Sequence, residues 1–176
     1  MKLPAFFVLA LGVVLAGCTD DKLGPQCPSA SVLSDTAVMT VFRAGAPADP
    51  SGEAYTATMG VVQTECSYPK GSSSVTSSLG FTVRATRAPS PDAASYVLPY
   101  YMAITQGDRI LSKRSLTLRI NFAPGSASTS VEESLPEDIR INLEPTHPPT
   151  DYQLLLGFQL TDAQRAYNQT RARYTP

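Results

Sequence analysis

The sequence predicts an all-β fold: a single antiparallel β-sandwich of the Ig-like type, with about seven to eight strands and a short C-terminal helix. Apolar and polar residues alternate over most of the chain, which is the period of a half-buried strand. Segments rich in Gly, Pro, Ser and Asp separate these stretches at short intervals. The chain has 176 residues, 43% of them hydrophobic and 16% charged, which indicates one folded domain with its own core.

The expected strands follow one another along the chain. They cover residues 36–43, 54–63, 75–86, 95–105, a segment from 109 to 122, 139–143 and 152–160. In the second strand Tyr55, Ala57, Met59 and Val61 alternate with small or polar residues, so their side chains are expected on the buried face. Residues 123–138, rich in Ser, Gly and Glu, are expected to form a connection.

Two local signals concern the strand at 95–105. Pro99 lies within it, and because proline has no N–H to donate, it indicates a sheet edge or a bulge. Gln106-Gly107-Asp108 follows and predicts a tight turn. The segment from Arg109 is then the returning strand of a hairpin.

The last part of the chain changes from the strand period to that of a helix. Thr161 and Gln164 have the spacing of a capping box, which predicts a short helix over residues 162 to 171. Its apolar face is thin, and its basic side chains are expected in solvent, where they could also touch anionic envelope polymers. The apolar residues are Ala163, Ala166 and Tyr167, and the basic ones are Arg165, Arg171 and Arg173.

The first 18 residues predict an exported protein. Lys2 supplies a positive charge, and residues 5–16 form an apolar run. This run is shorter than the about 20 residues that span a bilayer, but it fits the core of a secretory signal. Leu15-Ala16-Gly17-Cys18 ends the run and resembles the lipobox of bacterial lipoproteins. The resemblance implies cleavage before Cys18 and acyl chains on that residue, which anchor the protein in a membrane. The alternative is an ordinary secretory signal with an incidental cysteine.

These signals divide the chain into three parts. Residues 1–17 are the expected signal peptide, 18–28 the lipidated N-terminus and tether, and 29–176 the β-sandwich domain, with its helix from about residue 162. The lipoprotein resemblance also implies sorting to the outer membrane, because Thr19 and not an aspartate follows the lipidated cysteine.

Three cysteines are an odd number for a secreted chain. With Cys18 lipidated, Cys27 and Cys66 remain, and an oxidising compartment favours a disulfide between them. Two free thiols or a metal site are the alternatives. The segment contains no histidine to complete a metal site.

The residues able to carry chemistry are few. His147, the single histidine, lies between Thr146 and two prolines, and we expect a solvated side chain with no ligand cluster beside it. Serines gather at 72–74 and 126–130, in expected loops that lack the G-x-S-x-G turn of hydrolases. We therefore expect no catalytic residue, no metal site and no cofactor.

Acidic residues and tyrosines are two further candidates for binding groups. The acidic residues Glu132, Glu133, Glu137 and Asp138 are expected on a solvated loop, because neighbours on an extended chain point to opposite faces. Tyrosines on a sandwich face could bind a sugar or a protein edge, although core and rim packing is the expectation. These tyrosines are Tyr55, Tyr68, Tyr96, Tyr100, Tyr101 and Tyr152.

The mature chain resembles small envelope lipoproteins of Gram-negative bacteria over most of residues 27–170. The segments that suggest this are Glu65-Cys66-Ser67-Tyr68, Tyr100-Tyr101-Met102-Ala103-Ile104, and 157–161 continuing to Tyr167-Asn168. The resemblance implies a lipid-anchored protein of the outer membrane that faces the periplasm, and it names no reaction.

We expect a non-enzymatic interaction or assembly module with an envelope protein as its partner. The alternatives are a glycan-binding, small-ligand-binding or inhibitor-type lipoprotein, and an enzyme. A net charge of −1 gives no basic surface for nucleic acid, so no nucleic-acid partner is expected.

Overall fold

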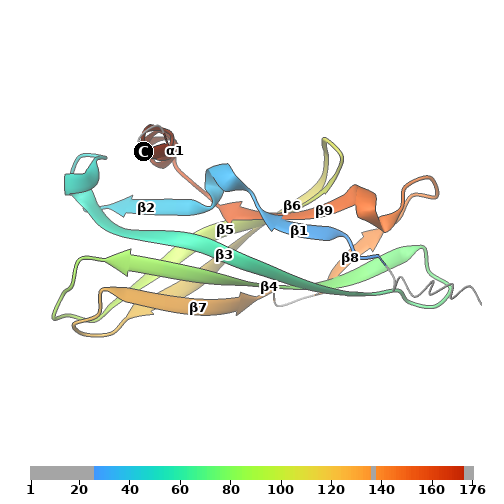
Figure 1. Cartoon of the computed structure of the whole chain (residues 1–176), viewed down its shortest axis with the longest axis horizontal. Helices are drawn as coiled ribbons and strands as arrows, with labels where there is room; N and C mark the ends of the chain where they lie inside the picture. Colours follow the sequence, from blue (N-terminus) through green and yellow to red (C-terminus); the bar gives the residue numbers. More distant parts are fainter. Residues whose placement is uncertain (1–25, 136–137, 173–176) are drawn as a thin grey trace, which may run out of the picture.

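Two facing β-sheets and one helix make up the described part of the protein (Figure 1). The computed structural model describes residues 26–135 and 138–172. Within these ranges there are nine strands, more than the seven to eight predicted. They are β1 (Ser29–Val32), β2 (Val38–Phe42), β3 (Glu53–Ser67), β4 (Ser74–Arg87), β5 (Ala94–Gln106), β6 (Arg109–Phe122), β7 (Ser128–Ser134), β8 (Ile139–Asn142) and β9 (Tyr152–Phe158), and α1 covers Asp162–Ala172.

The first sheet has the strand order β1-β9-β5-β6. The second has the order β2-β3-β4-β7. β8 pairs with the first residues of β4, and β7 pairs with the later ones. This confirms the predicted two-sheet arrangement with a C-terminal helix, whereas its Ig-like type stays a prediction. Not every pair is antiparallel, because β1 runs parallel to β9. The strand β1 was not predicted, because its four residues (SASV) adjoin the expected tether and carry almost no strand signal.

The core lies between the two sheets and follows the predicted alternation. On β9 the side chains of Tyr152, Leu154, Leu156 and Phe158 are fully buried. On β6 the buried side chains are Leu118, Ile120 and Phe122, and the residues between them are exposed. The second sheet contributes Val75, Leu79, Phe81 and Val83 from β4. Since each fully buried side chain of this kind stabilises the fold by about 1.5–3 kcal/mol, the inner faces hold the sheets together.

A bulge in β3 overturns one predicted core position. Met59 pairs with Val83, but Val62 and not Val61 pairs with Phe81, so β3 contains one extra residue at this point. The extra residue reverses the alternation that follows. Val61, predicted on the buried face, is therefore 69% exposed, and Val62 is the residue that packs against the core.

Pro99 lies on β5, which is a central strand and not the edge strand that the proline suggested. Its ladder with β9 ends at Tyr100, and the Pro99 carbonyl accepts a hydrogen bond from the Gln159 N–H at 2.9 Å. In a strand the nitrogen and carbonyl of one residue point to the same side. The missing N–H therefore faces the side on which the β9 ladder has ended, and pairing with β6 is preserved.

The connection expected at residues 123–138 contains a strand. Ser128–Ser134 forms β7, which pairs with β4 from Thr86 to Gly80. Its composition (STSVEES) suggested a loop, because Val131 is its single apolar residue. The strand lies at the rim of its sheet and needs little apolar burial to stay paired.

The predicted hairpin and helix are confirmed. Gly107 has φ +55° in the two-residue turn between β5 and β6, a backbone conformation that favours glycine. At the start of α1, the Thr161 N–H donates to Gln164 Oε1 at 2.9 Å and the Gln164 N–H donates to Thr161 Oγ1 at 3.3 Å, which forms the capping box. None of the described helical segments has the length and apolar character that a membrane crossing requires.

A disulfide joins Cys27 to Cys66, as the sequence predicted, with a Cα–Cα distance of 5.7 Å. Cys66 lies on β3 in the second sheet, whereas Cys27 precedes β1 in the first sheet, so the bond ties the two sheets together. The Tyr68 hydroxyl donates to the Gln26 carbonyl beside it. These contacts fix the point at which the chain enters the domain.

Removing the disulfide should destabilise the domain. The bridge closes a loop with a sequence separation of 39 residues, and the double substitution C27S/C66S should lower the free energy of unfolding by roughly 2–5 kcal/mol. Denaturant unfolding of both forms measures this change. In the unreduced, unfolded wild-type chain neither Cys27 nor Cys66 should react with iodoacetamide, and alkylation of both would contradict the bridge.

Gly157 should not tolerate a side chain. A Cβ at this position of β9 would lie 2.0 Å from Thr36 Oγ1 and 2.8 Å from the Tyr101 hydroxyl oxygen. Those two groups also contact each other at 2.9 Å. G157A should therefore cost about 1–3 kcal/mol in thermal or denaturant unfolding. G80A is the matched strand control, because its Cβ would meet neighbours no closer than 3.7 Å, and equal losses for the two variants would refute the assignment.

Candidate functional site

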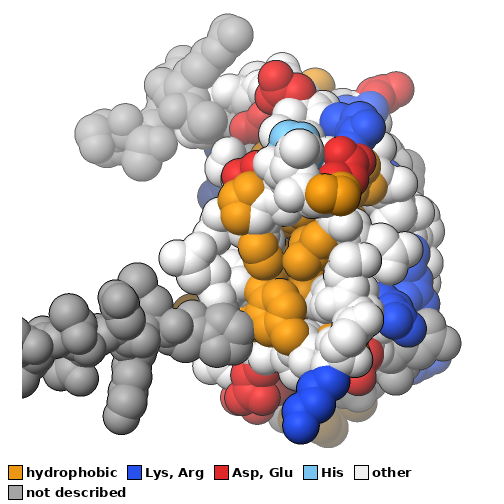
Figure 2. Space-filling view, turned by 90° about the vertical axis from the view of Figure 1, so that its right-hand side faces the viewer, with side chains coloured by type: hydrophobic (Ala, Val, Ile, Leu, Met, Phe, Trp, Pro, Cys, Tyr) orange, Lys and Arg blue, Asp and Glu red, His pale blue; other side chains and the backbone are white. Residues whose placement is uncertain are grey.

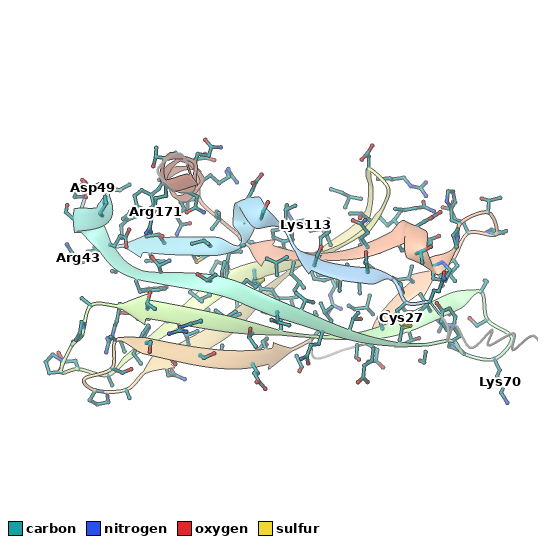
Figure 3. The ribbon with its side chains drawn as sticks, in the orientation of Figure 1. Cys27, Arg43, Asp49, Lys70, Lys113 and Arg171 are labelled. Carbon is teal, nitrogen blue, oxygen red and sulfur yellow. A yellow bond between two sulfur atoms is a disulfide. The ribbon has the colours of Figure 1, made fainter. Side chains whose placement is uncertain are left out.

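The two ends of the sandwich differ in the chain segments that they carry. Cys27 and Lys70 lie toward one end of the long axis, and Arg43 and Asp49 lie at the other (Figure 3). The first is called here the disulfide end and the second the loop end. The predicted lipidation site Cys18 lies outside the described residues, and its role stays a prediction.

His147 lies at the disulfide end among charged side chains, as Figure 2 shows. Its Nδ1 is 2.9 Å from Asp151 Oδ2, and its Nε2 is 3.9 Å from Glu144 Oε2. From the sequence this side chain was expected in solvent with no ligand cluster beside it, and the nearby Asp151 and Glu144 were not singled out. The turn of η3 (Pro149–Asp151) brings Asp151 back to the ring, which linear spacing through a proline loop did not reveal.

The same cluster extends to β6. The Arg109 guanidinium donates to Glu144 Oε1 at 2.6 Å, and this hydrogen bond holds the pKa of the Glu144 carboxyl below its usual value. Arg109, Glu144, His147 and Asp151 thus form one network of polar and charged side chains on the surface, with a carboxylate facing each ring nitrogen of the histidine. Among the described residues, no three His, Cys, Asp or Glu side chains are grouped to hold a metal ion.

The described acidic residues of 132–138 differ in their elements and in their exposure. Glu132 and Glu133 lie on β7 and not on a loop, opposite Thr82 and Phe81 of β4. Glu132 is exposed, whereas Glu133 is half-buried, and the charge of Glu133 adds to the effect of burial in raising the pKa of Tyr100. Asp138 is exposed, and Glu137 lies outside the described residues.

The serine-rich stretches are partly in strands. Ser74 is the first residue of β4 and is buried, with its Oγ 2.6 Å from Ser72 Oγ and accepting a hydrogen bond from Arg140 Nε at 3.2 Å. Ser128 begins β7, so only the first part of 126–130 is a loop. These hydroxyls hold strand ends in place.

The tyrosines serve the core and rim and not an exposed binding face. Tyr55, Tyr100, Tyr101 and Tyr152 are each 7% exposed or less. The Tyr55 ring lies 4.2 Å from the Tyr96 ring, centroid to centroid. The expected packing role is therefore confirmed for these side chains, because rings buried in this way offer no free face to a ligand.

Three loops gather at the loop end (Figure 1). They connect β2 to β3 (43–52), β4 to β5 (88–93) and β6 to β7 (123–127). Each contains an Ala-Pro pair: Ala46-Pro47, Ala88-Pro89 and Ala123-Pro124. Proline restricts the backbone of each loop before anything binds, which lowers the entropy cost of ordering it in a complex.

Arg87, the last residue of β4, fastens two of these loops together. Its Nη2 donates to the Asp92 carbonyl at 2.7 Å, and its Nε donates to the Ser126 carbonyl at 3.2 Å. Its guanidinium carbon lies 4.6 Å from the centre of the Phe122 ring. The loops also bond directly, since the Gly125 N–H donates to the Ser90 carbonyl at 2.7 Å.

Arg43 fixes the third loop in a similar way. Its Nη1 donates to the Glu53 carbonyl at 2.8 Å, and its Nη2 donates to the Ser51 carbonyl. Asp49 Oδ1 accepts from the Ser51 N–H at 2.8 Å, capping η2 (Pro50–Gly52), and its bonds with Ser51 lower the pKa of this carboxyl. All three loops of the loop end are therefore held in one conformation by side-chain bonds to backbone groups.

This surface was not predicted from the sequence. Its signal is the Ala-Pro pair in each of three connections, together with an arginine next to two of them. That signal becomes meaningful only when the topology places the three loops side by side. A scan of protein-family models, a search of curated proteins and a search of solved structures each found no match for the chain.

The buried tyrosines should make the folded protein sensitive to alkali. Burial raises the pKa of Tyr55 and of Tyr100 to about 12, with smaller contributions from Tyr96 and Glu133. Unfolded tyrosine ionises near pH 10, so above about pH 10 the unfolded chain loses protons that the folded chain keeps. Stability should fall between about pH 10 and pH 12.

Absorbance titration of tyrosinate in the folded protein checks this. Y55F and Y100F should each remove one late-titrating hydroxyl, whereas wild-type protein whose tyrosines all ionise near pH 10 while still folded would contradict the assignment.

Proposed function

We propose that the protein is a non-enzymatic interaction or assembly module, held on the periplasmic face of the outer membrane by lipid on Cys18. The observation that carries the proposal is that the two ends of the domain differ. The chain enters at the disulfide end, and the three fixed loops lie at the opposite end (Figures 1 and 3). A lipid anchor at the first end would present the second to a partner protein.

The length of the tether supports this orientation. Cys27 follows Cys18 by nine residues, so the disulfide end would lie within about 30 Å of the lipid. The strand β3 has 15 residues, so the sandwich extends up to about 50 Å along that direction. The loop end would then lie beyond the reach of lipid headgroups and within the reach of another envelope protein.

The chemistry of the loop end favours a protein partner recognised by shape. Arg43 has its guanidinium bonded to carbonyls of its own loop, and Arg87 bonds backbone groups of two loops. Segments 43–52 and 87–93 together hold two arginines and two aspartates, and 123–127 holds no charged residue, so there is no net charge to steer an anionic or cationic partner. An association of this kind depends on apolar contact and loop preorganisation, so salt should weaken it little.

The polar groups also favour a non-enzymatic role. His147 contacts Asp151 and Glu144 on an exposed loop, and the buried tyrosines pack in the core. These side chains have structural partners that account for their positions. The function is therefore assigned to the surface of the domain and not to a reaction centre.

Photocrosslinking in intact cells tests the proposal. A photoreactive amino acid placed at Ala48, Ala88 or Ala127 of the loop end should capture one protein of defined mass. The same amino acid at Lys70 or Thr146 of the disulfide end should not capture that protein. All five positions have exposed side chains, which makes the two sets comparable.

Two controls separate the anchor from the surface. C18S should leave an uncleaved or soluble precursor, seen by fractionation and mass, and should lose the crosslink because the loops are no longer presented at the membrane. R87Q should weaken the crosslink without changing fractionation, whereas R84Q, on the same strand with an exposed side chain, should not. Capture of one protein only from the disulfide end would refute the assigned surface.

A further inference from the structure

The helix α1 lies beside β2, the edge strand of the second sheet (Figure 1). Two side-chain amides on one face of the helix reach the strand. Gln164 Nε2 donates to the Thr40 carbonyl at 2.9 Å, and Asn168 Nδ2 donates to the Val38 carbonyl at 2.8 Å. Four residues along a helix cover about the same distance as two residues along a strand. The two amides can therefore donate to the carbonyls of Val38 and Thr40, which point to the same side of β2.

These carbonyls belong to the free edge of the strand. The Met59 N–H of β3 donates to the Ala37 carbonyl at 2.8 Å, so Ala37 points toward β3. Alternate residues point to opposite sides, which directs the backbone groups of Val38 and Thr40 away from β3. An additional strand would pair with these same backbone groups, and the side chains of α1 occupy the carbonyls instead.

β2 is the edge strand that most needs such a cover. Its sequence is VMTVF, which has strong β-formers and no charge or proline to discourage pairing. The other described edges carry their own protection. β1 and β8 have four residues each, β7 carries Glu132 and Glu133, and β6 carries Arg109, Lys113, Arg114 and Arg119.

The attachment of α1 is light. Tyr167 is its one buried side chain among the described residues, and this ring packs against Phe42 at 5.1 Å while its hydroxyl donates to Glu53. Ala163 and Ala166, the other apolar residues of the predicted face, are exposed. A helix held by one ring and a few polar bonds opens more readily than the sandwich that it covers.

We propose that α1 is an edge guard, which occupies the pairing edge of β2 and so keeps two copies of this chain from joining through that strand. With α1 displaced, the β2 strands of two copies would pair antiparallel about Thr40. This inference does not depend on the lipid anchor or on the loop end.

The test uses the full chain, purified in the form in which cells make it and compared in one detergent buffer. Q164A/N168A removes both amide donors, and Q169A, an exposed residue of the same helix, is the control. In the double variant amide hydrogen exchange along α1 should rise at least about tenfold, because these two bonds hold the helix on β2. Sedimentation should show a concentration-dependent dimer that neither wild type nor Q169A forms.

Two further variants make the result specific. Adding V38K to Q164A/N168A should restore the monomer, because a lysine on an edge strand opposes strand pairing. Gln164 also caps the helix, and the double variant could lose its fold for that reason. N168D keeps the shape of Asn168 and the capping box while removing one donor, so it should show the same changes in smaller degree.

Three results would overturn the proposal. Unchanged exchange along α1 would mean that the two amides do not hold the helix on the edge. Faster exchange without a dimer would mean that the uncovered edge does not self-pair. A dimer that V38K leaves intact would place the contact elsewhere on the molecule.

Discussion

The arrangement of this domain depends on one covalent constraint, the Cys27–Cys66 bond between the start of one sheet and the long strand of the other. β1 has four residues, and its parallel partner β9 lies far along the chain. The few hydrogen bonds of β1 therefore offset little of the entropy cost of ordering this strand. The disulfide holds Cys27 beside β3, and β1 can then reach only the neighbouring edge of the first sheet. The entry point of the chain, and with it the direction of the three-loop surface, follows from that bond.

Polar side chains in this molecule mostly hold backbone segments in place. Arg87 and Arg43 bind carbonyls of the loops, and Gln164 binds both the start of its own helix and the Thr40 carbonyl. The buried Tyr152 hydroxyl accepts from the Glu144 N–H at 2.9 Å and so fixes the loop after β8. Each bond satisfies a backbone group that the strands leave unpaired, which explains how a strand-rich domain keeps ordered connections between short ladders.

Local patterns in the sequence predicted the parts of the fold that local energetics determine. The alternation along β6 and β9, the turn at Gly107 and the capping box at Thr161 depend on neighbouring residues, and the structure confirms them. The bulge that exposes Val61, the strand at 128–134 and the parallel strand β1 depend on partners distant in the chain. For the same reason Asp151 beside His147, and the convergence of three Ala-Pro loops, were visible only once the strands were paired.

The two ends and the edge of the sandwich divide the surface into parts with different physical characters. The disulfide end concentrates exposed ion pairs, which water and salt screen and which contribute little to stability. The loop end carries rigid backbone turns with no net charge, and under the proposed function it would bind a partner at a low cost in conformational entropy. The β2 edge has the most general pairing chemistry of the three, since any extended chain could use it, and it is the one that the fold covers with a helix. Under the proposed function this arrangement favours selective binding, because the unselective edge is covered while the loop end stays accessible.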